Sequence, residues 1–177
     1  MNLYLRLLKV LLGLPFVRRS GLFDPGRIHF RSWPNDLDLN LHINNGRYLT
    51  FMDLGRIHLL AQMGLLGTVV RRGWQPVLTA AEINFVRAIG PFQRFALVTR
   101  LLTWDEKYFY IEQQFLRGET LCAVASVRGL FLERGRRVAP AEAIEVLKPD
   151  AVAPEMPALI RHWNDLMEIK KEQTATR

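Results

Sequence analysis

The residues of this chain best suited to chemistry lie together between Asp36 and Tyr48. Asp38, Asn40 and His42 occupy alternate positions, with leucine residues between them. Alternate side chains of an extended segment share one face. The spacing therefore predicts that a carboxylate, an amide and an imidazole line up on one side of this segment.

A helix start follows this polar segment directly. Asn44, Asn45 and Gly46 are typical of a helix N-cap region, where a side-chain oxygen accepts a hydrogen bond from a backbone amide. The amides at a helix start carry a partial positive charge. The Asp38 carboxylate beside them would be a base facing a dipole that polarises a carbonyl group.

One long helix must position these groups. Residues 48–63 carry apolar side chains around most of the helix circumference, and Gly64 is expected to end it as a C′ residue. A helix that is apolar nearly all round is buried. The sequence therefore predicts that the polar segment leads directly into the core.

Strands are predicted on both sides of this helix in the chain. A short half-buried strand is expected at 27–33, and longer ones, rich in aromatic and β-branched residues, at 77–86, 95–104, 108–116 and 121–132. An antiparallel meander that curls around one helix buries the apolar face of the sheet and the helix together. This pattern predicts an α+β fold.

Both ends of the chain are predicted to contain helices. Residues 1–16 are mostly apolar and precede Arg18 and Arg19, which allows two interpretations. One is an amphipathic helix on a membrane surface, and the other is a helix that covers an apolar patch of the domain or of a partner subunit. The segment is too short and too charged for a membrane span and is a poor signal peptide. The predicted organisation is an N-terminal apolar and basic helix at 1–20, a core domain at 27–147 with a helix at 140–147, and a C-terminal helix at 157–173.

The composition indicates one globular domain with a basic surface. The chain has 177 residues, of which 49% are hydrophobic, and a net charge of +7 carried by 19 arginines and five lysines against 17 acidic residues. The arginines are scattered and no nucleic-acid motif accompanies them, so nucleic acid is the least favoured anionic partner. Arginine suits phosphate groups, such as those of coenzyme A or phosphopantetheine. The single cysteine, Cys122, excludes an internal disulfide and is expected to be buried.

The polar segment, placed before a buried helix, resembles the hotdog-fold thioesterases. Asp38 to Asn45 matches the Asp-x-Asn-x-His-x-Asn-Asn pattern of plant acyl-ACP thioesterases at every named position. The longer run Trp33 to Tyr48 is similar to the thioesterase superfamily member six group, as are Met52 to Arg56 and Trp104 to Lys107. The 4-hydroxybenzoyl-CoA thioesterase group is also similar, although it has glycine at the position of Leu41. The likeness covers roughly residues 27 to 145.

This resemblance implies a hotdog fold, in which an antiparallel sheet wraps around a long helix, and the activity of an acyl thioester hydrolase. The substrate would be an acyl-CoA or an acyl-ACP, and the site would lie at the interface of a homodimer or of a dimer of dimers. The implied roles are general base or nucleophile for Asp38, positioning of the reacting groups for Asn40 and His42, an oxyanion site at the helix start for Asn44, Asn45 and Gly46, and substrate contact for Tyr48 and Met52.

Other residues have simpler interpretations. Asp38 itself could form an Asx-turn before the helix, and Asp36 is the alternative carboxylate. Asp53 and Arg56, three residues apart on the predicted helix, are expected to form an ion pair. No Gly-x-Ser-x-Gly nucleophile elbow occurs. The histidines lack carboxylates or cysteines at ligand spacing, so we expect neither a metal nor a cofactor.

A rival hypothesis comes from the apolar N-terminal segment. It describes a non-catalytic, membrane-associated hotdog protein that binds acyl chains or lipids. In either case a cytoplasmic location is expected, with peripheral membrane contact through residues 1–19 as the added feature of the rival.

Overall fold

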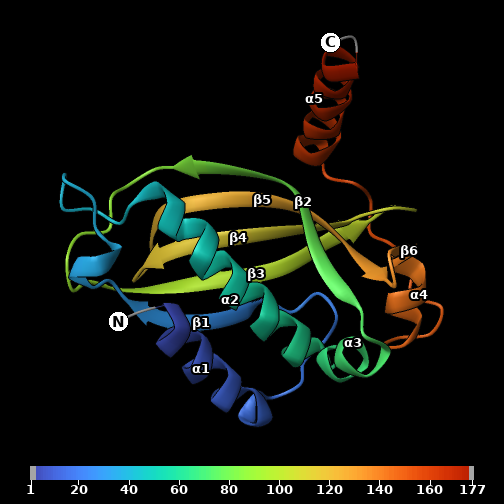
Figure 1. Ribbon diagram of the computed structural model, residues 1–177, viewed down its shortest axis with the longest axis horizontal. Coiled ribbons are helices and arrows are strands. Elements are labelled where there is room, and N and C mark those ends of the chain that lie inside the picture. The colour runs from blue at the N-terminus through green and yellow to red at the C-terminus, as the bar shows by residue number, and fades with distance from the viewer. Residues whose placement is uncertain (1–2, 176–177) are drawn as a thin grey trace.

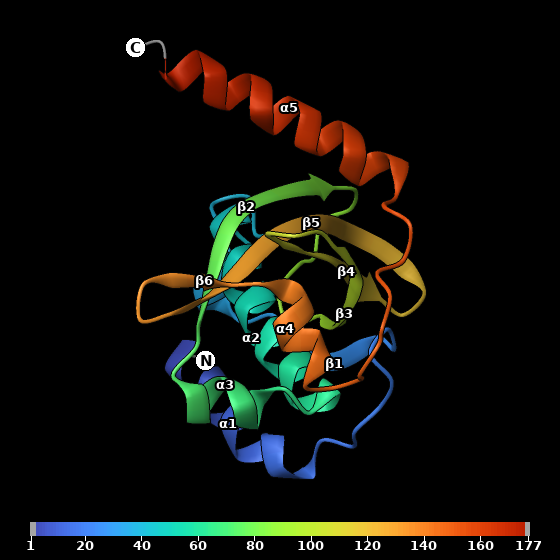
Figure 2. The ribbon, with the colours of Figure 1, turned by 90° about the vertical axis from the view of Figure 1, so that its right-hand side faces the viewer.

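The computed structural model describes residues 3–175, in which an antiparallel sheet curls around the long helix α2 (Asn45–Met63), as Figures 1 and 2 show. The strand order is β1-β3-β4-β5-β2, and β6 pairs with β5. This confirms the predicted α+β arrangement. The strands are β1 (Gly26–Arg31), β2 (Gln75–Phe85), β3 (Arg94–Trp104), β4 (Phe109–Arg117), β5 (Thr120–Glu133) and β6 (Arg136–Val138).

The middle of α2 lies very close to the sheet. A Cβ atom at Gly55 would come within 2.6 Å of the Thr99 hydroxyl and 2.7 Å of a Leu97 methyl group, so no larger residue fits there. Gln113 is fully buried at this contact, where its Nε2 donates to the Met52 carbonyl at 3.0 Å and to the Thr99 hydroxyl at 2.9 Å. The close approach therefore holds α2 at a defined height above the strands.

The two ends of α2 are fixed by their predicted residues. Asn44 is the N-cap, and Gly64 adopts the left-handed conformation expected of a C′ residue, with φ of 81°. A second helix, α3 (Leu66–Arg72), follows at once and ends at Gly73 with φ of 67°. Helix α3 was not predicted, because seven residues carry too little periodicity to identify a helix.

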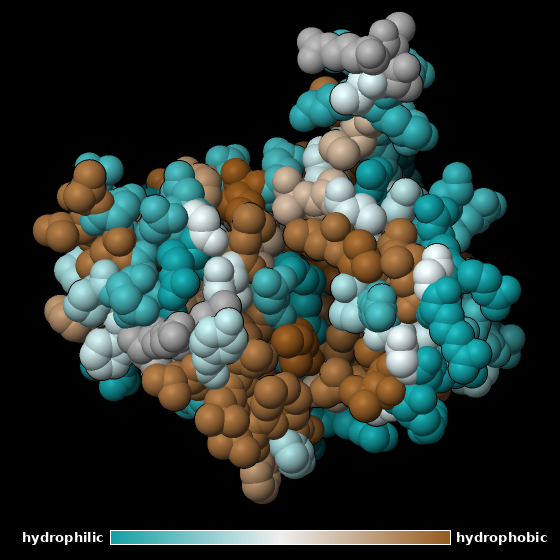
Figure 3. All heavy atoms as spheres, in the orientation of Figure 1, coloured by the Kyte–Doolittle hydropathy of each residue, from teal (hydrophilic) through white to brown (hydrophobic). Residues whose placement is uncertain are grey.

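The N-terminal segment forms α1 (Leu3–Gly13), followed by a 3₁₀ turn at Leu14–Phe16. This helix lies against α2 and the outer edge of β1, and its own residues Arg6 and Val10 are buried on the face that points toward them. This placement agrees with the interpretation of a helix that covers the domain. Its opposite face is exposed and apolar, and Figure 3 shows hydrophobic side chains gathered over this part of the surface.

The C-terminal elements are α4 (Pro140–Glu145) and α5 (Ala158–Ala175). Ile160 and Trp163 of α5 pack against Tyr110 on the outer face of the sheet, and Asn164 donates to the Tyr110 hydroxyl at 2.7 Å. The rest of α5 projects beyond the sheet (Figures 1 and 2). Across residues 3–175, no helix combines the length and the apolar character needed to cross a membrane.

Candidate active site

The polar segment forms a tight loop between β1 and α2. Leu37 and Ile43 form an isolated antiparallel bridge, the Asp38 amide donates to the His42 carbonyl at 2.9 Å, and the Leu41 amide donates to the Asp38 carbonyl at 3.0 Å. The prediction of an extended segment with one polar face is therefore wrong here. The reason is that Asp38 side-chain and backbone bonds turn the chain back on itself, which alternation of residue types cannot indicate.

The Asp38 carboxylate caps this loop with one oxygen and leaves the other free. Its Oδ1 accepts hydrogen bonds from the Asn40 amide at 2.9 Å and, more weakly, from the His42 amide at 3.4 Å. This is the Asx-type turn expected as the simpler interpretation. Among residues 3–175 no group donates to Oδ2 and no cation pairs with the half-buried side chain. The loop therefore holds the carboxylate in place with an oxygen available to an incoming group.

Asn40 and His42 belong to the same loop as Asp38. Both are exposed, and neither side chain makes a hydrogen bond to another described residue. Leu41, between them, has φ of 57°, a left-handed conformation that suits glycine and that a leucine resists. The backbone therefore keeps the shape that glycine would favour at this position, even though the residue is leucine.

The other carboxylate of the segment, Asp36, has a different environment. It is fully buried and accepts two hydrogen bonds from the Arg6 guanidinium, at 2.6 and 2.5 Å, two from the Arg47 guanidinium, at 2.9 and 3.3 Å, and one from the Trp33 amide at 2.8 Å. Burial raises the pKa of Asp36, but the hydrogen bonds from Arg6, Trp33 and Arg47 outweigh it and hold the pKa below its ordinary value. With both oxygens bonded and no exposure, Asp36 cannot act as the alternative base.

The contact between Arg6 and Asp36 was not predicted. The two residues are 30 positions apart, and no local pattern indicates that an arginine of the N-terminal helix reaches this loop. Arg6 is itself 2% exposed, its guanidinium lies 4.6 Å from the Phe51 ring centroid, and its Nε has no hydrogen-bond partner in the described part of the chain. The ion pair joins α1 to the segment immediately before the catalytic candidate Asp38.

The start of α2 offers one free amide. Asn44 Oδ1 accepts from the Gly46 amide at 2.9 Å, and the Asn44 carbonyl accepts from the Arg47 amide at 2.8 Å. The amide of Asn45 makes no such bond within the described residues. Gly46 is therefore engaged by the cap, and the Asn45 amide is the donor that could receive an oxyanion.

Tyr48 and Met52 are core residues. They are 3% and 0% exposed, and the Tyr48 ring packs edge-on against Phe85 and Phe115 with centroids 4.9 and 4.7 Å apart. Burial, with a smaller contribution from Cys122, raises the pKa of Tyr48 to about 12. Neither side chain lines the apolar cavity beneath α2 or the cavity beside α1. The contact of Tyr48 and Met52 with substrate stays a prediction, and this arrangement does not favour it.

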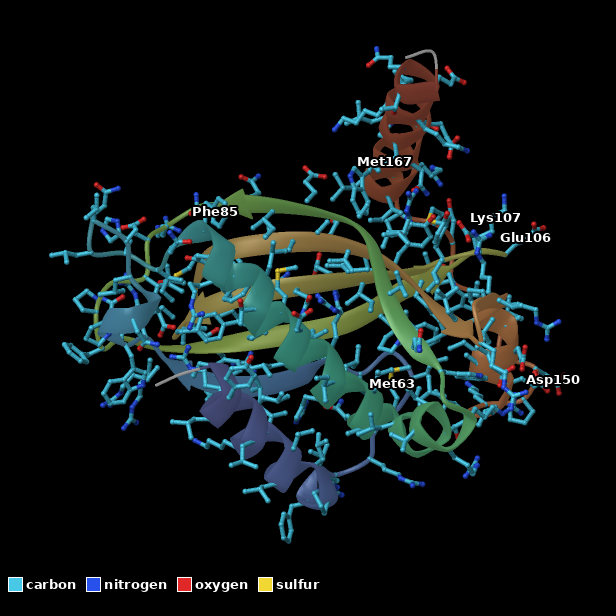
Figure 4. All side chains as sticks on the ribbon, in the orientation of Figure 1. Met63, Phe85, Glu106, Lys107, Asp150 and Met167 are labelled. Atoms are coloured by element: carbon cyan, nitrogen blue, oxygen red, sulfur yellow. The ribbon has the colours of Figure 1, made fainter. Side chains whose placement is uncertain are left out.

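An apolar cavity of about 280 Å³ lies between the second half of α2 and the sheet. Among the described residues that line it, the charged ones are Asp53 and Arg56, which form the predicted ion pair. Arg56 also donates to the Gln113 side chain at 2.8 Å. In Figure 4, Met63 lies at the C-terminal end of α2 and Phe85 lies at the C-terminal end of β2, on the opposite side of the view. The rest of the lining is aliphatic or aromatic and includes Ile57, Leu60, Met63, Val77, Leu78, Ile111 and Val127.

No group of metal-binding side chains occurs within residues 3–175. Cys122 is fully buried, as predicted. Asp105, in the segment that resembles the member six group, closes the turn between β3 and β4 by accepting from the Lys107 and Tyr108 amides at 2.7 Å, and it also accepts from the Tyr110 hydroxyl. That segment is therefore accounted for by structure alone.

Comparison with known proteins shows the family of this chain. Residues 32–164 match the family model described as thioesterase-like superfamily. The chain is 31% identical to Protein THEM6 of Drosophila melanogaster over 168 residues, which cover 93% of this chain and 84% of the fly protein. It is 25% identical to the probable thioesterase YBR096W of Saccharomyces cerevisiae, with 71% of this chain and 56% of the yeast protein covered.

Solved structures show the same fold. A probable thioesterase from Bartonella henselae superposes with a TM-score of 0.60 and 25% identity, covering 66% of this chain and 98% of that one. The probable thioesterase YbaW of Escherichia coli gives a TM-score of 0.62 at 18% identity, covering 68% and 97%. The chain therefore belongs to the thioesterase-like superfamily, has its hotdog fold, and is by family a thioester hydrolase.

Proposed function

We propose that this protein hydrolyses acyl thioesters of coenzyme A or of acyl carrier protein, with Asp38 as the catalytic carboxylate. The observation that carries the proposal is the free Oδ2 of Asp38 in a loop that ends at the unpaired Asn45 amide. A carboxylate and a helix-start amide in one short segment supply a base and an oxyanion donor together.

The chemistry needs few groups. The thioester carbonyl oxygen would accept a hydrogen bond from the Asn45 amide, which stabilises the negative charge that develops on that oxygen. Asp38 would take a proton from a water molecule as the water oxygen bonds to the carbonyl carbon. The carbon–sulfur bond would then break, and the proton would pass to the departing thiolate. The exposed Asn40 and His42 would orient the water and the thioester.

The apolar cavity is the proposed binding place for the acyl chain. Asn45 and Asp53 are eight residues apart on α2, which corresponds to about 12 Å along the helix. The loop and the cavity of one chain are therefore separated by two helical turns. This separation supports a site that combines the loop of one subunit with the cavity face of another.

The free edge of β2 supports such a pairing. β2 is an 11-residue edge strand that, within residues 3–175, pairs with β5 alone, and it exposes Val77, Leu78 and Phe85. A long apolar edge with unpaired backbone groups is a template for pairing with another chain. We expect sedimentation analysis to give at least twice the monomer mass of 20.5 kDa, and a fully active monomer would contradict a shared site.

The role of Asp38 is tested by Asp38→Asn. The amide can still accept the loop hydrogen bonds but cannot act as a base, so the rate of acyl-CoA hydrolysis should fall by about 10² to 10⁴. Release of free thiol across a panel of acyl chain lengths is the measurement. Asp24→Asn is the matched control, because the Asp24 carboxylate also accepts a hydrogen bond from a backbone amide, that of Gly21, at 2.7 Å. Unchanged turnover in Asp38→Asn would remove Asp38 from the mechanism.

Peripheral membrane association is a second proposal, favoured by the outer face of α1. The exposed apolar residues on this face are Tyr4, Leu5, Leu8, Leu11 and Leu12. Lys9, Arg18 and Arg19 lie nearby in the chain, as in helices that bind anionic bilayers. Leu8→Glu with Leu12→Glu should abolish flotation with anionic liposomes, whereas Leu159→Glu with Leu166→Glu on α5 should not. Equal flotation of the two double variants would exclude α1 as the surface that attaches to the membrane.

A further inference from the structure

A second and larger cavity lies on the other side of the molecule from the β2 edge, between α1 and β1. Its volume is about 660 Å³, within the range of 300–1,000 Å³ typical of small-molecule sites. It shares no lining residue with the apolar cavity beneath α2. The roof is α1 together with Val17, which follows the 3₁₀ turn, and one wall is the edge strand β1.

The charged groups of this cavity are all basic. Lys9, Arg31 and Arg94 line it together with Arg6, and no aspartate or glutamate of the described part of the chain does. Arg6 is neutralised by Asp36, but no ion pair or hydrogen bond engages the side chains of Lys9, Arg31 or Arg94 within residues 3–175. Three unpaired cations therefore border a single cavity.

Arg31 and Arg94 also face each other directly. They are register partners in the antiparallel pair of β1 and β3, so their side chains emerge on the same face. Cβ atoms of opposite residues lie about 5 Å apart, and like charges in that position destabilise the pair unless an anion lies between them. The arrangement is unfavourable in the empty protein and becomes favourable when a negatively charged group binds.

The remaining lining is mainly apolar, apart from the imidazole side chains of His29 and His58. Val10 and Val17 contribute from the roof, and Ile28 and Phe30 from β1. The Cβ position of Gly13, which also lines the cavity, has no atom within 4 Å, so the roof leaves open space there. The cavity thus combines an apolar trough with a cationic rim.

We propose that this cavity binds a single-chain amphiphile with an anionic head, a carboxylate or a phosphate. The hydrocarbon chain lies in the trough under α1, where it loses contact with water. The head group bridges Arg31 and Arg94, with Lys9 within the same rim, and forms charge-assisted hydrogen bonds with them. The site is separate from Asp38 and does not require catalysis.

Calorimetric titration of the full chain with palmitate, hexadecyl lysophosphatidate and the neutral hexadecanol tests this site. Gly13→Trp places a large side chain in the open space under the roof, and Gly13→Ala is its matched control. Arg31→Gln with Arg94→Gln removes the paired cations, and Arg136→Gln, an exposed arginine of β6, controls for loss of charge. Leu78→Trp narrows the apolar cavity, so that any binding of palmitate there is recognised separately.

We expect the wild-type protein to bind an anionic amphiphile. Its affinity should fall by about ten-fold or more in Gly13→Trp and in the double arginine variant. The affinity should be retained in Gly13→Ala, Arg136→Gln and Leu78→Trp. Hexadecanol should bind more weakly, and added salt should weaken the anionic ligands. The tighter of palmitate and lysophosphatidate identifies the head group. Palmitate binding that Leu78→Trp abolishes and the other variants leave unchanged would overturn the proposal. So would binding of coenzyme A, but of neither amphiphile, at the arginine pair. Neither result depends on whether Asp38 is catalytic.

Discussion

Asp36 and Asp38 are two residues apart in one motif, yet the fold gives them opposite environments. Asp36 is fully buried, and both of its oxygens are bonded to arginines. Asp38 is half-buried and unpaired, and uses a single oxygen to cap its own loop. The first carboxylate is bound within the structure, and the second has an oxygen free to react.

The difference shows that a carboxylate's function depends on which of its oxygens are already bonded. An aspartate held between Arg6 and Arg47 stays ionised but has no lone pair accessible to a substrate. Asp36 instead joins α1, the loop and the first turn of α2, and so supports the position of Asp38 from behind. The same loop therefore contains a structural residue and the catalytic candidate.

The largest difference is expected in stability. Asp36→Asn leaves Arg6 buried without a counter-charge, which should lower the free energy of unfolding by about 3–5 kcal/mol. Asp38→Asn preserves the loop hydrogen bonds and should change it by less than about 1 kcal/mol. Urea unfolding of both variants measures the contrast. Similar losses in the two variants would mean that the environments of the two carboxylates differ less than the structure indicates.

The pH dependence of stability sharpens the same contrast. The pKa of Asp36 is depressed in the folded protein, so its contribution is fully present above its unfolded value of 3.8 and is lost as the pH falls through the folded pKa. The stability difference between the wild type and Asp36→Asn should therefore be constant from pH 5 to 7 and shrink progressively below about pH 4. Urea unfolding across this pH series tests the sign. A difference that grows on acidification would contradict it.

The smallest effect concerns the backbone of the Asp38 loop. Leu41 has φ of 57°, which costs a leucine about 1–2 kcal/mol, whereas glycine loses about 0.5–1 kcal/mol in chain entropy. Leu41→Gly should therefore stabilise the protein slightly, by up to about 1 kcal/mol, without lowering activity. Leu39→Gly, at a fully exposed leucine of the same loop without a positive φ, should destabilise it. Equal losses in both variants would show that the loop carries no strain at Leu41.

Most of the secondary structure could be predicted from local patterns. The helix predicted at 48–63 is observed at Asn45–Met63, and the strand predicted at 95–104 is observed at Arg94–Trp104. The buried apolar residues of these elements recur along the chain with the period of a helix or a strand, so the elements can be predicted from the sequence. Short α3 lacks such a pattern and was not predicted.

The candidate site was predicted in part. The residue types from Asp38 to Asn45 and the cap at Asn44 could be identified because capping and turn formation depend on near neighbours. The extended shape assigned to the segment was wrong, since the bridge between Leu37 and Ile43 folds it into a loop.

The sequence by itself determined the order of helices and strands, the buried character of α2 and the set of polar residues at its start, because each of these depends on neighbours in the chain. Tertiary structure alone decided which aspartate is buried against Arg6 and which arginines meet across β1 and β3. These outcomes depend on groups brought together from distant parts of the chain. Burial and long-range pairing thus separate Asp36 from Asp38, although both belong to the same motif.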